Sequence, residues 1–431
     1  MRPPGCARRP EDLTVSANLI QIAPGAIPSK GGVDKRRAVF WPTAMNPKLV
    51  LLLLFTVALL SKHLDQLLAP QFFSDDGGGF FMESVSMGWS SVLHVYNSFL
   101  YVVPRVISST FCSIVPWAWL PLAYNLSAVF ITVYIALRLI GARLPRFAGP
   151  LMAIALVTVL HNGDVFINLC CSHVFFGVLL VVNLLEPAPI RPGETIRRMV
   201  EAMLAALSGP EAIILAPFML WGALRWRKEP RGWLVLGSMA AGAAIEAAAM
   251  CIFPRELDTG WSVAISQFLP VVPYYSQGIF CSWCGSSHAY LVGVIVALIV
   301  SSIFGFLFCE SGNPYRVQTL LFLVCAALFL IAGKLAAGWA NPLGNGARYT
   351  YLPFVLVWWS LAWLLIGSNC WIRRSLAASL ILAIVASSTT RWSAYPYPDY
   401  HWRQQVSEVQ AGKRTMFIVP PDWKIPVPHR R

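Results

Sequence analysis

Charge is scarce in this chain. Only 12% of its 431 residues are Asp, Glu, Lys or Arg, while 57% are hydrophobic and the mean hydropathy is +0.61. This composition excludes an ordinary soluble protein of one or two domains. Apolar runs recur along most of the chain, and each comes close to the ~20 residues that cross ~30 Å of hydrocarbon. We therefore predict an all-α polytopic membrane protein in contact with the lipid bilayer.

Several other features are also missing. The ten cysteines form no disulfide framework, because several lie in apolar segments, where a small buried side chain is the default interpretation. The exception is the pair Cys281 and Cys284, in a loop that we place outside the cytoplasm, where a disulfide could form. No second ligand pair accompanies it at a zinc-site spacing. No internal repeat stands out, which argues weakly against inverted-repeat transporter folds.

The first 44 residues differ from the rest. They are rich in Pro, Gly and Arg, and they lack apolar periodicity and a small-residue cleavage site. We predict that residues 1–44 form a disordered basic extension, or that an over-long gene prediction has added them before Met45. The net charge of +13 does not indicate a nucleic-acid partner, because Lys and Arg concentrate in this extension and in short loops.

The charges of the connections assign sides to the apolar runs. Basic connections are cytoplasmic by the positive-inside rule, which places the N-terminus in the cytoplasm. The other connections carry acidic and aromatic residues and are expected outside: residues 70–113, 162–164, 254–285, 337–347 and a short extracytoplasmic tail, 391–431. A transmembrane domain at 45–390 would contain the apolar runs, at about 49–69, 114–137, 147–161, 165–185, 232–253, 286–308, 318–336, 348–367 and 375–390.

One stretch breaks the simple alternation of sides. Residues 186–198 and 225–231 are both basic, yet a single apolar run of about 26 residues joins them. Ser208-Gly209-Pro210 lies in its middle, and Gly-Pro breaks a helix. We predict two half-helices that meet there, which gives about eleven transmembrane or half-membrane helices in all. The alternative is one kinked helix with a misassigned loop.

The first outer loop, 70–113, is long and not simply polar. Its segment Val102-Val103-Pro104-Arg105-Val106-Ile107 is too short to span, so we expect an interfacial helix there, with partly helical structure from Phe80 to Ser91. The same loop carries an acidic pair, Asp75 and Asp76, followed by three glycines that let the backbone approach a ligand closely. Carboxylates are costly near a bilayer, so the pair is expected to face water, a metal or a substrate. A solvated acidic loop is the plainer alternative.

Further polar residues fall on the same outer side. The candidates for substrate binding are Arg105, Asp164, Asn168, His173, Arg348 and Tyr349. Arg348 opens an apolar run on the outer side, against the positive-inside bias, so it should have an anionic partner. Plainer alternatives are turn chemistry for Asp164, a hydrogen-bonded core position for His173, and a headgroup contact or an ion pair with the tail for Arg348.

These parts suit transfer of a phosphate-activated group. An arginine can bind a phosphate while a carboxylate takes the proton of an attacking hydroxyl, as in glycosyl transfer from a polyprenyl-phosphate sugar. Asp75 and Asp76 could instead hold a divalent cation, Mg²⁺ or Mn²⁺, that neutralises the phosphate. We predict no other cofactor.

The chain resembles the GT-C superfamily of integral-membrane glycosyltransferases, in a poorly characterised bacterial branch. The resemblance extends from about residue 46 to 425 and is carried by short motifs: Asp75-Asp76, then Gly88-Trp89, Tyr96-Asn97-Ser98-Phe99-Leu100 and Pro104-Arg105, the break at Ser208-Gly209-Pro210 with Pro217, and Phe417-Ile418-Val419-Pro420-Pro421-Asp422-Trp423 near the end. It implies that Asp75 or Asp76 is the catalytic base or a metal ligand, that Asp164 is a second-loop acid, and that Arg348 contacts the donor phosphate.

The chain lacks a large outer soluble domain, since only about forty residues follow the last apolar run. That departure from the family favours a cell-envelope glycan or glycolipid over a protein as acceptor. We therefore expect a transferase in the bacterial inner (plasma) membrane with an extracytoplasmic site. The alternatives are a transporter or flippase of lipid-linked sugars, for which Glu246 and Lys334 are the candidate mid-membrane charges, and a polysaccharide polymerase or ligase.

Overall fold

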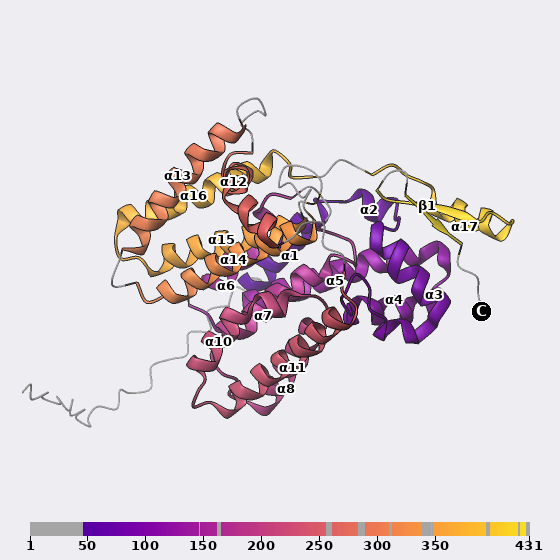
Figure 1. Cartoon of the computed structure of the whole chain (residues 1–431), viewed down its shortest axis with the longest axis horizontal. Helices are drawn as coiled ribbons and strands as arrows, with labels where there is room; N and C mark the ends of the chain where they lie inside the picture. Colours follow the sequence, from indigo (N-terminus) through magenta and orange to yellow (C-terminus); the bar gives the residue numbers. More distant parts are fainter. Residues whose placement is uncertain are drawn as a thin grey trace, which may run out of the picture. The chain divides into compact units, whose positions relative to one another are not determined.

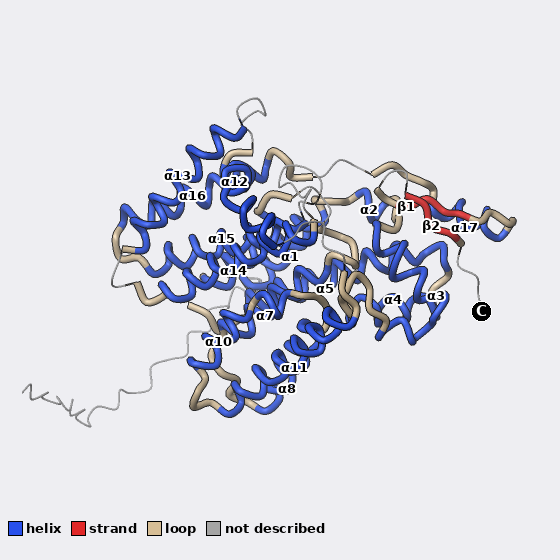
Figure 2. Tube along the Cα trace, in the orientation of Figure 1, coloured by secondary structure: helices blue, strands red, loops and turns tan. Residues whose placement is uncertain are grey.

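The structure is a computed structural model of the whole chain. It describes residues 46–145, 147–161, 165–255, 261–282, 289–309, 313–337, 346, 348–393, 397–420 and 423–427. The predicted extension 1–44 therefore lies outside the described residues. The described part is mostly helical, as the composition predicts, with one two-stranded sheet (Figures 1 and 2).

The elements follow one another from the first apolar helix to a strand pair near the end. The first half contains α1 (Pro47–Leu60), α2 (Asp65–Leu68), the π-helical turn η1 (Asp76–Phe81), α3 (Met82–Met87), η2 (Gly88–Leu93), α4 (Val102–Ile114), η3 (Trp117–Trp119), α5 (Leu120–Gly141), α6 (Ala148–Thr158), α7 (Ser172–Leu185), α8 (Pro192–Ala206), α9 (Glu211–Ile214) and α10 (Ala216–Arg225). The second half contains α11 (Pro230–Ile252), α12 (Trp261–Phe280), α13 (Ala289–Phe308), α14 (Arg316–Ala336), α15 (Arg348–Gly367), α16 (Trp371–Thr389), α17 (Trp402–Gln410), β1 (Thr415–Ile418) and β2 (Trp423–Pro426).

Five helices in the described part are long and apolar enough to cross a membrane. They are Trp117–Gly141, Pro230–Ile252, Arg316–Ala336, Arg348–Gly367 and Trp371–Thr389. Shorter apolar helices lie at Pro47–Leu60, Val102–Ile114, Ala148–Thr158, Ser172–Leu185 and Tyr290–Phe306. A membrane protein is thus supported, while the larger predicted number of spans depends on whether these shorter helices also enter the bilayer.

The predicted helix break lies between α8 and α10. α8 ends at Ala206, a short α9 begins at Glu211, and the chain passes Ser208-Gly209-Pro210 between them. Ser208 Oγ donates to Leu204 O at 2.7 Å and accepts from Val103 N at 3.2 Å, so the break is tied to the start of α4. α4 itself extends the predicted interfacial helix to Ile114.

The main core surrounds α15, which is buried along most of its length. Two of its side chains form hydrogen bonds with a neighbouring helix: Tyr351 Oη donates to Leu156 O at 2.6 Å, and Trp359 Nε1 donates to Met152 O at 3.0 Å. Both acceptors belong to α6. α15 is therefore the helix around which the others pack, and it carries Arg348 at its first position.

The C-terminal tail contains the helix α17 and a strand pair. β1 and β2 pair antiparallel, and the following Val419 donates its backbone N–H to Phe72 O at 3.0 Å (Figure 2). Trp402 of α17 packs edge-on against Phe72, with ring centroids 4.8 Å apart. A second hydrophobic cluster thus joins the tail to the first outer loop.

The region predicted as an outer loop, 254–285, contains a helix, α12. Pro270 and Pro273 both lie within this helix. Cys281 forms a disulfide, as its position suggested, and Cys284, the expected partner, lies outside the described residues. Ser282 Oγ donates to Ser387 O at 2.7 Å, which ties this end of α12 to α16.

Candidate functional site

Asp75 and Asp76 stand where the chain enters the turn η1. The glycines that follow have a packing role. A Cβ on Gly77 would meet Ile418 Cγ2 at 3.1 Å, and one on Gly79 would meet the ring of Tyr96 at 3.0 Å. The sequence led us to expect close approach of a ligand here. In the structure, the side chains of Ile418 and Tyr96 approach the backbone at these glycines, and they hold the acidic pair in place.

Asp76 is enclosed by protein, with 1% of its surface exposed. Its Oδ2 accepts a hydrogen bond from Leu169 N at 3.0 Å, whereas its buried Oδ1 has no hydrogen-bond partner among the described residues. Burial raises the pKa of Asp76 to about 8, against the opposing effect of the backbone N–H donors, and the negative charge of Asp75 adds to the rise. Asp76 is thus a neutral carboxyl group at neutral pH and a poor choice for the base.

Asp75 is half-buried and remains within reach of a substrate. Its Oδ1 accepts the hydroxyl hydrogen of Tyr96 at 2.8 Å. Burial raises the pKa of Tyr96, and the negative charge of Asp75 raises it further, so Tyr96 stays a donor that orients the carboxylate. Of the two acids, Asp75 has the geometry of a base.

Arg348 lies close enough to Asp75 for their charges to interact, although the two are far apart in sequence. Within the described part of the chain, Arg348 is half-buried, forms no ion pair, and contacts the ring of Tyr349, 5.3 Å from the guanidinium carbon. Tyr349 also faces the site, since it interacts electrostatically with Tyr101. An arginine in this position can accept a second anion, such as a phosphate.

His173 pairs with Glu211, a residue that sequence reasoning did not select. His173 Nδ1 lies 2.5 Å from Glu211 Oε1, and Glu211 Oε2 is buried without a hydrogen-bond partner in the described part. Gly209 leaves room for this pair, because a Cβ there would meet Glu211 Oε2 and lie 3.0 Å from His173 Cβ. The available signal was the position of Glu211 directly after the helix break.

Tyr101 contacts His173 and also interacts electrostatically with Asp75. Its ring packs edge-on against that of His173, with centroids 5.7 Å apart. Burial raises the pKa of Tyr101 well above its usual value, and the charges of Asp75 and Glu211 add to the rise. We call this group of residues the acidic site: Asp75, Asp76, Tyr101, His173, Glu211 and Arg348.

The backbone around the acidic site is strained. Ser74, Tyr101 and Ile167 have φ values of 33°, 53° and 58°, in the left-handed region that residues other than glycine seldom adopt. Such conformations persist only where the surroundings impose them, and they concentrate at functional sites. Here Ser74 N donates to Val419 O, so the tail holds the strained residue directly before Asp75.

The remaining predicted residues have other surroundings. Arg105 is fully buried, with its Nη1 at 2.6 Å from Glu83 Oε2 and at 2.9 Å from Ser91 O. It therefore stabilises the first loop, and we leave it out of the site. Asn168 accepts from Cys171 N at 3.1 Å and so shapes the turn before α7. Asp164 lies outside the described residues, and its role stays a prediction.

The metal alternative finds little support in the side chains present. Among the described residues, no group of three or more His, Cys, Asp or Glu side chains gathers in a way that could hold a metal ion. Asp75 and Asp76 would have to bind Mg²⁺ or Mn²⁺ as two adjacent carboxyl groups, and Asp76 is enclosed, with its Oδ2 already accepting a hydrogen bond from Leu169 N. These residues do not fit a resident divalent cation well.

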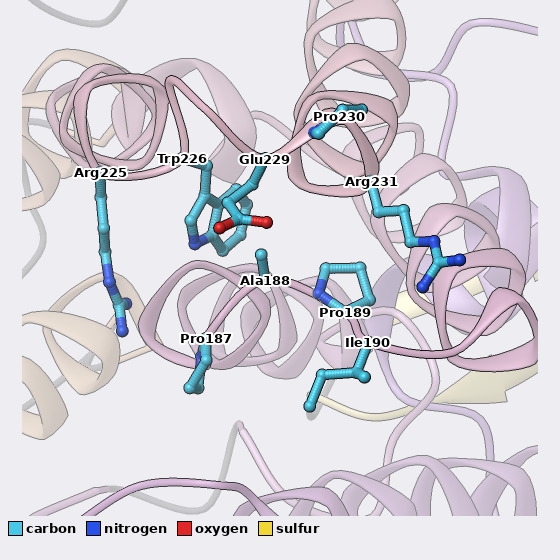
Figure 3. A pocket seen from close by; sticks show the side chains of 9 residues that line it. All are labelled: Pro187, Ala188, Pro189, Ile190, Arg225, Trp226, Glu229, Pro230 and Arg231. Atoms are coloured by element: carbon cyan, nitrogen blue, oxygen red, sulfur yellow. The ribbon is translucent and has the colours of Figure 1, made fainter.

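The acidic site lies at the start of α7, where His173 stands. Beyond the other end of α7, a pocket of about 610 Å³ opens between two connections (Figure 3). One wall is the segment from Pro187 to Ile190, which joins α7 to α8. The other wall contains Arg225 and Trp226 at the end of α10 and Glu229, Pro230 and Arg231 at the start of α11.

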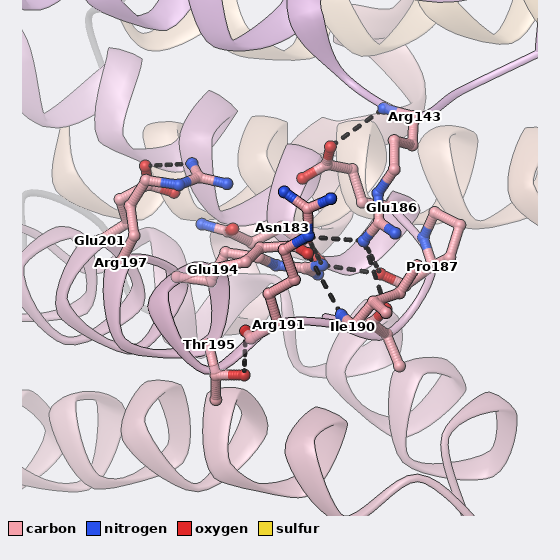
Figure 4. A network of polar contacts seen from close by, with 12 residues as sticks. Arg143, Asn183, Glu186, Pro187, Ile190, Arg191, Glu194, Thr195, Arg197 and Glu201 are labelled. Carbon is pink, nitrogen blue, oxygen red and sulfur yellow. Dashed lines mark hydrogen bonds and ion pairs between the residues drawn. The ribbon is translucent and has the colours of Figure 1, made fainter.

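Ion pairs surround this end of α7 (Figure 4). Arg138 lies between two carboxylates, 3.1 Å from Glu186 and 2.9 Å from Glu201. Arg198 is fully buried and donates to Pro187 O at 2.6 Å, close to the end of α7, where a cation complements the helix dipole. We call the following residues the arginine network: Arg138, Arg143, Glu186, Glu194, Arg197, Arg198 and Glu201.

Comparison of the chain with protein-family models, with curated proteins and with solved structures gives no match, so its function has to be inferred from the site itself.

Proposed function

We propose that this protein is a membrane glycosyltransferase that moves a sugar from a polyprenyl-phosphate donor to a hydroxyl group of a cell-envelope glycan or glycolipid. The observation that carries the proposal is the electrostatic interaction between Arg348 and Asp75, which are far apart in sequence and form no ion pair with each other. One group is an acid able to take a proton, and the other is a cation without an ion-pair partner in the described part.

In the proposed reaction, the acceptor oxygen attacks the anomeric carbon of the sugar. The bond from that carbon to the phosphate oxygen breaks, the new carbon–oxygen bond forms, and the hydroxyl proton passes to Asp75. Arg348 binds the donor phosphate and stabilises the negative charge that collects on it as it leaves. The phosphate leaves as an anion, so no general acid is needed.

The other residues position these two groups. Tyr96 donates to Asp75 and fixes the direction of its carboxylate. Asp76, neutral at pH 7, brings no second negative charge beside the base or the phosphate. His173 is oriented by Glu211 and lies against Tyr101, and in the proposed reaction it holds hydroxyl groups of the sugar.

Transport of lipid-linked sugars ranks second. A transporter needs charged groups along a path between the two sides of the membrane. Glu246, one of the two candidates for such a path, is buried and accepts from Leu100 N at 3.3 and 3.2 Å. Its carboxylate thus holds the first loop against α11, which favours a structural role.

The test compares cell-envelope glycans and polyprenyl-phosphate sugars by mass spectrometry in cells that express wild type, Asp75→Asn or Asp399→Asn. The amide oxygen introduced by Asp75→Asn can still accept from Tyr96, so the fold should persist, and Asp399 is an exposed acid of the tail whose replacement serves as a matched control. We expect Asp75→Asn to lower transfer by about 10²–10⁴-fold and to leave unspent donor. The same sugar on the glycans of all three strains would refute the proposal, and donor moved between leaflets without transfer would favour a transporter.

A further inference from the structure

The pocket beside the arginine network has a defined charge pattern. Arg225 and Arg231 lie at the two ends of the wall formed by α10 and α11, and Glu229 lies between them (Figure 3). Arg225 uses Nη1 to donate to Leu185 O at 2.7 Å. The side chains of Glu229 and Arg231 have no ion pair within the described part of the chain. The lining therefore carries one net positive charge, which suits a ligand with a single negative charge.

Two further donor groups in the pocket have no partner. No side chain caps the start of α11, a helix of 23 residues. Its first residue, Pro230, has no N–H and Trp233 N donates to Glu229 O, so the N–H groups of Arg231 and Gly232 are left for a ligand. Trp226 is 2% exposed, and its buried Nε1 lacks a hydrogen-bond partner in the described part. Burial of an unpaired N–H is costly, and an acceptor in the pocket would remove that cost.

The surroundings of the pocket are apolar. Ile190 in its wall is 67% exposed, and Leu224 and Trp233, next to its lining in sequence, are 66% and 48% exposed. Exposed apolar side chains beside charged ones are typical of the boundary between hydrocarbon and headgroups. A ligand bound here would have apolar surface within reach of its hydrophobic part.

We propose that this pocket binds the phosphodiester headgroup of an anionic membrane phospholipid. The phosphate accepts hydrogen bonds from the side chain of Arg231, from backbone N–H groups at the start of α11 and from Trp226 Nε1. Arg225 lies at the other end of the pocket. Glu229 opposes the bound anion and keeps the affinity moderate. The volume of about 610 Å³ lies within the usual range of small-molecule sites. This site is separate from the acidic site and does not depend on the proposed transfer reaction.

The test is native mass spectrometry of the full-length protein in detergent, titrated with phosphatidylglycerol and, in parallel, with phosphatidylcholine. We expect the wild type to prefer phosphatidylglycerol. Arg231→Gln should weaken that binding by about fivefold, while Glu229→Gln should strengthen it by about threefold. The matched control is Arg227→Gln, which removes a neighbouring exposed charge that does not line the pocket and should change the affinity by less than about twofold.

The opposite signs of the two pocket variants separate a built site from general surface charge. Equal losses in Arg231→Gln and Arg227→Gln would overturn the proposal, and so would weaker binding in Glu229→Gln. Soluble glycerophosphoglycerol, added in excess, should not displace the lipid. Full displacement would overturn the assignment to a lipid and indicate a free phosphodiester.

Discussion

Charged side chains near the two ends of α7 differ in whether they have ion-pair partners. In the arginine network, every arginine and glutamate has an oppositely charged partner within ion-pair distance. In the acidic site His173 pairs with Glu211, but Asp75 and Arg348 have no ion-pair partner among the described residues. Paired charges fix the relative positions of helices, whereas unpaired charges are left to act on a ligand. Mutations at the two ends should therefore affect different properties.

The largest effect on stability should come from Glu201→Gln. Its Oε1 accepts from Arg138 Nε at 2.9 Å and from Arg197 Nη1 at 2.7 Å, and the change leaves Arg138 buried with Glu186 alone. Removal of one partner from a buried pair costs about 3–5 kcal/mol. We expect a lower melting temperature in detergent, measured by tryptophan fluorescence. Arg197→Gln removes the more exposed partner and should cost less than about 1 kcal/mol, so equal losses would contradict the distinction.

A smaller effect, and one on binding alone, is expected for Arg348→Gln. The change should raise the donor KM tenfold to a hundredfold, because a hydrogen bond to a charged group contributes about 1.5–3 kcal/mol. The melting temperature should hardly change, since no ion pair within the described part is lost. Arg414→Gln, on the exposed tail, is the control for loss of a positive charge. An unchanged donor KM would remove Arg348 from the site.

The smallest effect concerns Asp76 and pH. Its pKa is about 8 in the folded protein against 3.8 for an ordinary Asp, so between these values the folded state binds more protons than the unfolded state. The contribution of Asp76 to the free energy of unfolding is therefore fully present below pH 3.8 and is lost as the pH rises through 8. Wild type should lose about 1.4 kcal/mol between pH 7 and pH 9 relative to Asp76→Asn, measured by melting at each pH. Parallel pH profiles for the two proteins would show that Asp76 is already ionised at pH 7.

Local features of the fold were predictable because they depend on neighbouring residues. The break at Ser208-Gly209-Pro210 follows from a dipeptide that cannot continue a helix, and the structure places it between α8 and α9. The start of α15 at Arg348 coincides with the predicted start of an apolar run. These predictions needed no knowledge of what packs against each segment.

Long-range partners were not predictable in the same way. Periodicity does not reveal that Glu211 pairs with His173, or that Glu83 forms an ion pair with Arg105. The secondary structure of the tail could not be predicted for a related reason. Its strands are four residues long, too short to give a clear pattern, and they are held by contacts with Phe72 and Gly77 in the first outer loop. Sequence patterns thus select the candidates, and the fold decides which of them meet.

The bond between the tail and the first loop has a consequence for the order of synthesis. The segment with Ser74 and Asp75 is made before α5 to α17, yet its backbone partner Val419 is made after all of them. During elongation, the strained conformation of Ser74 has no support from β1 and β2. Ser74 therefore gains its backbone partner only after Val419 has been made. A chain that stops before β1 already contains α1 to α17 but lacks this hydrogen bond directly before the acidic pair.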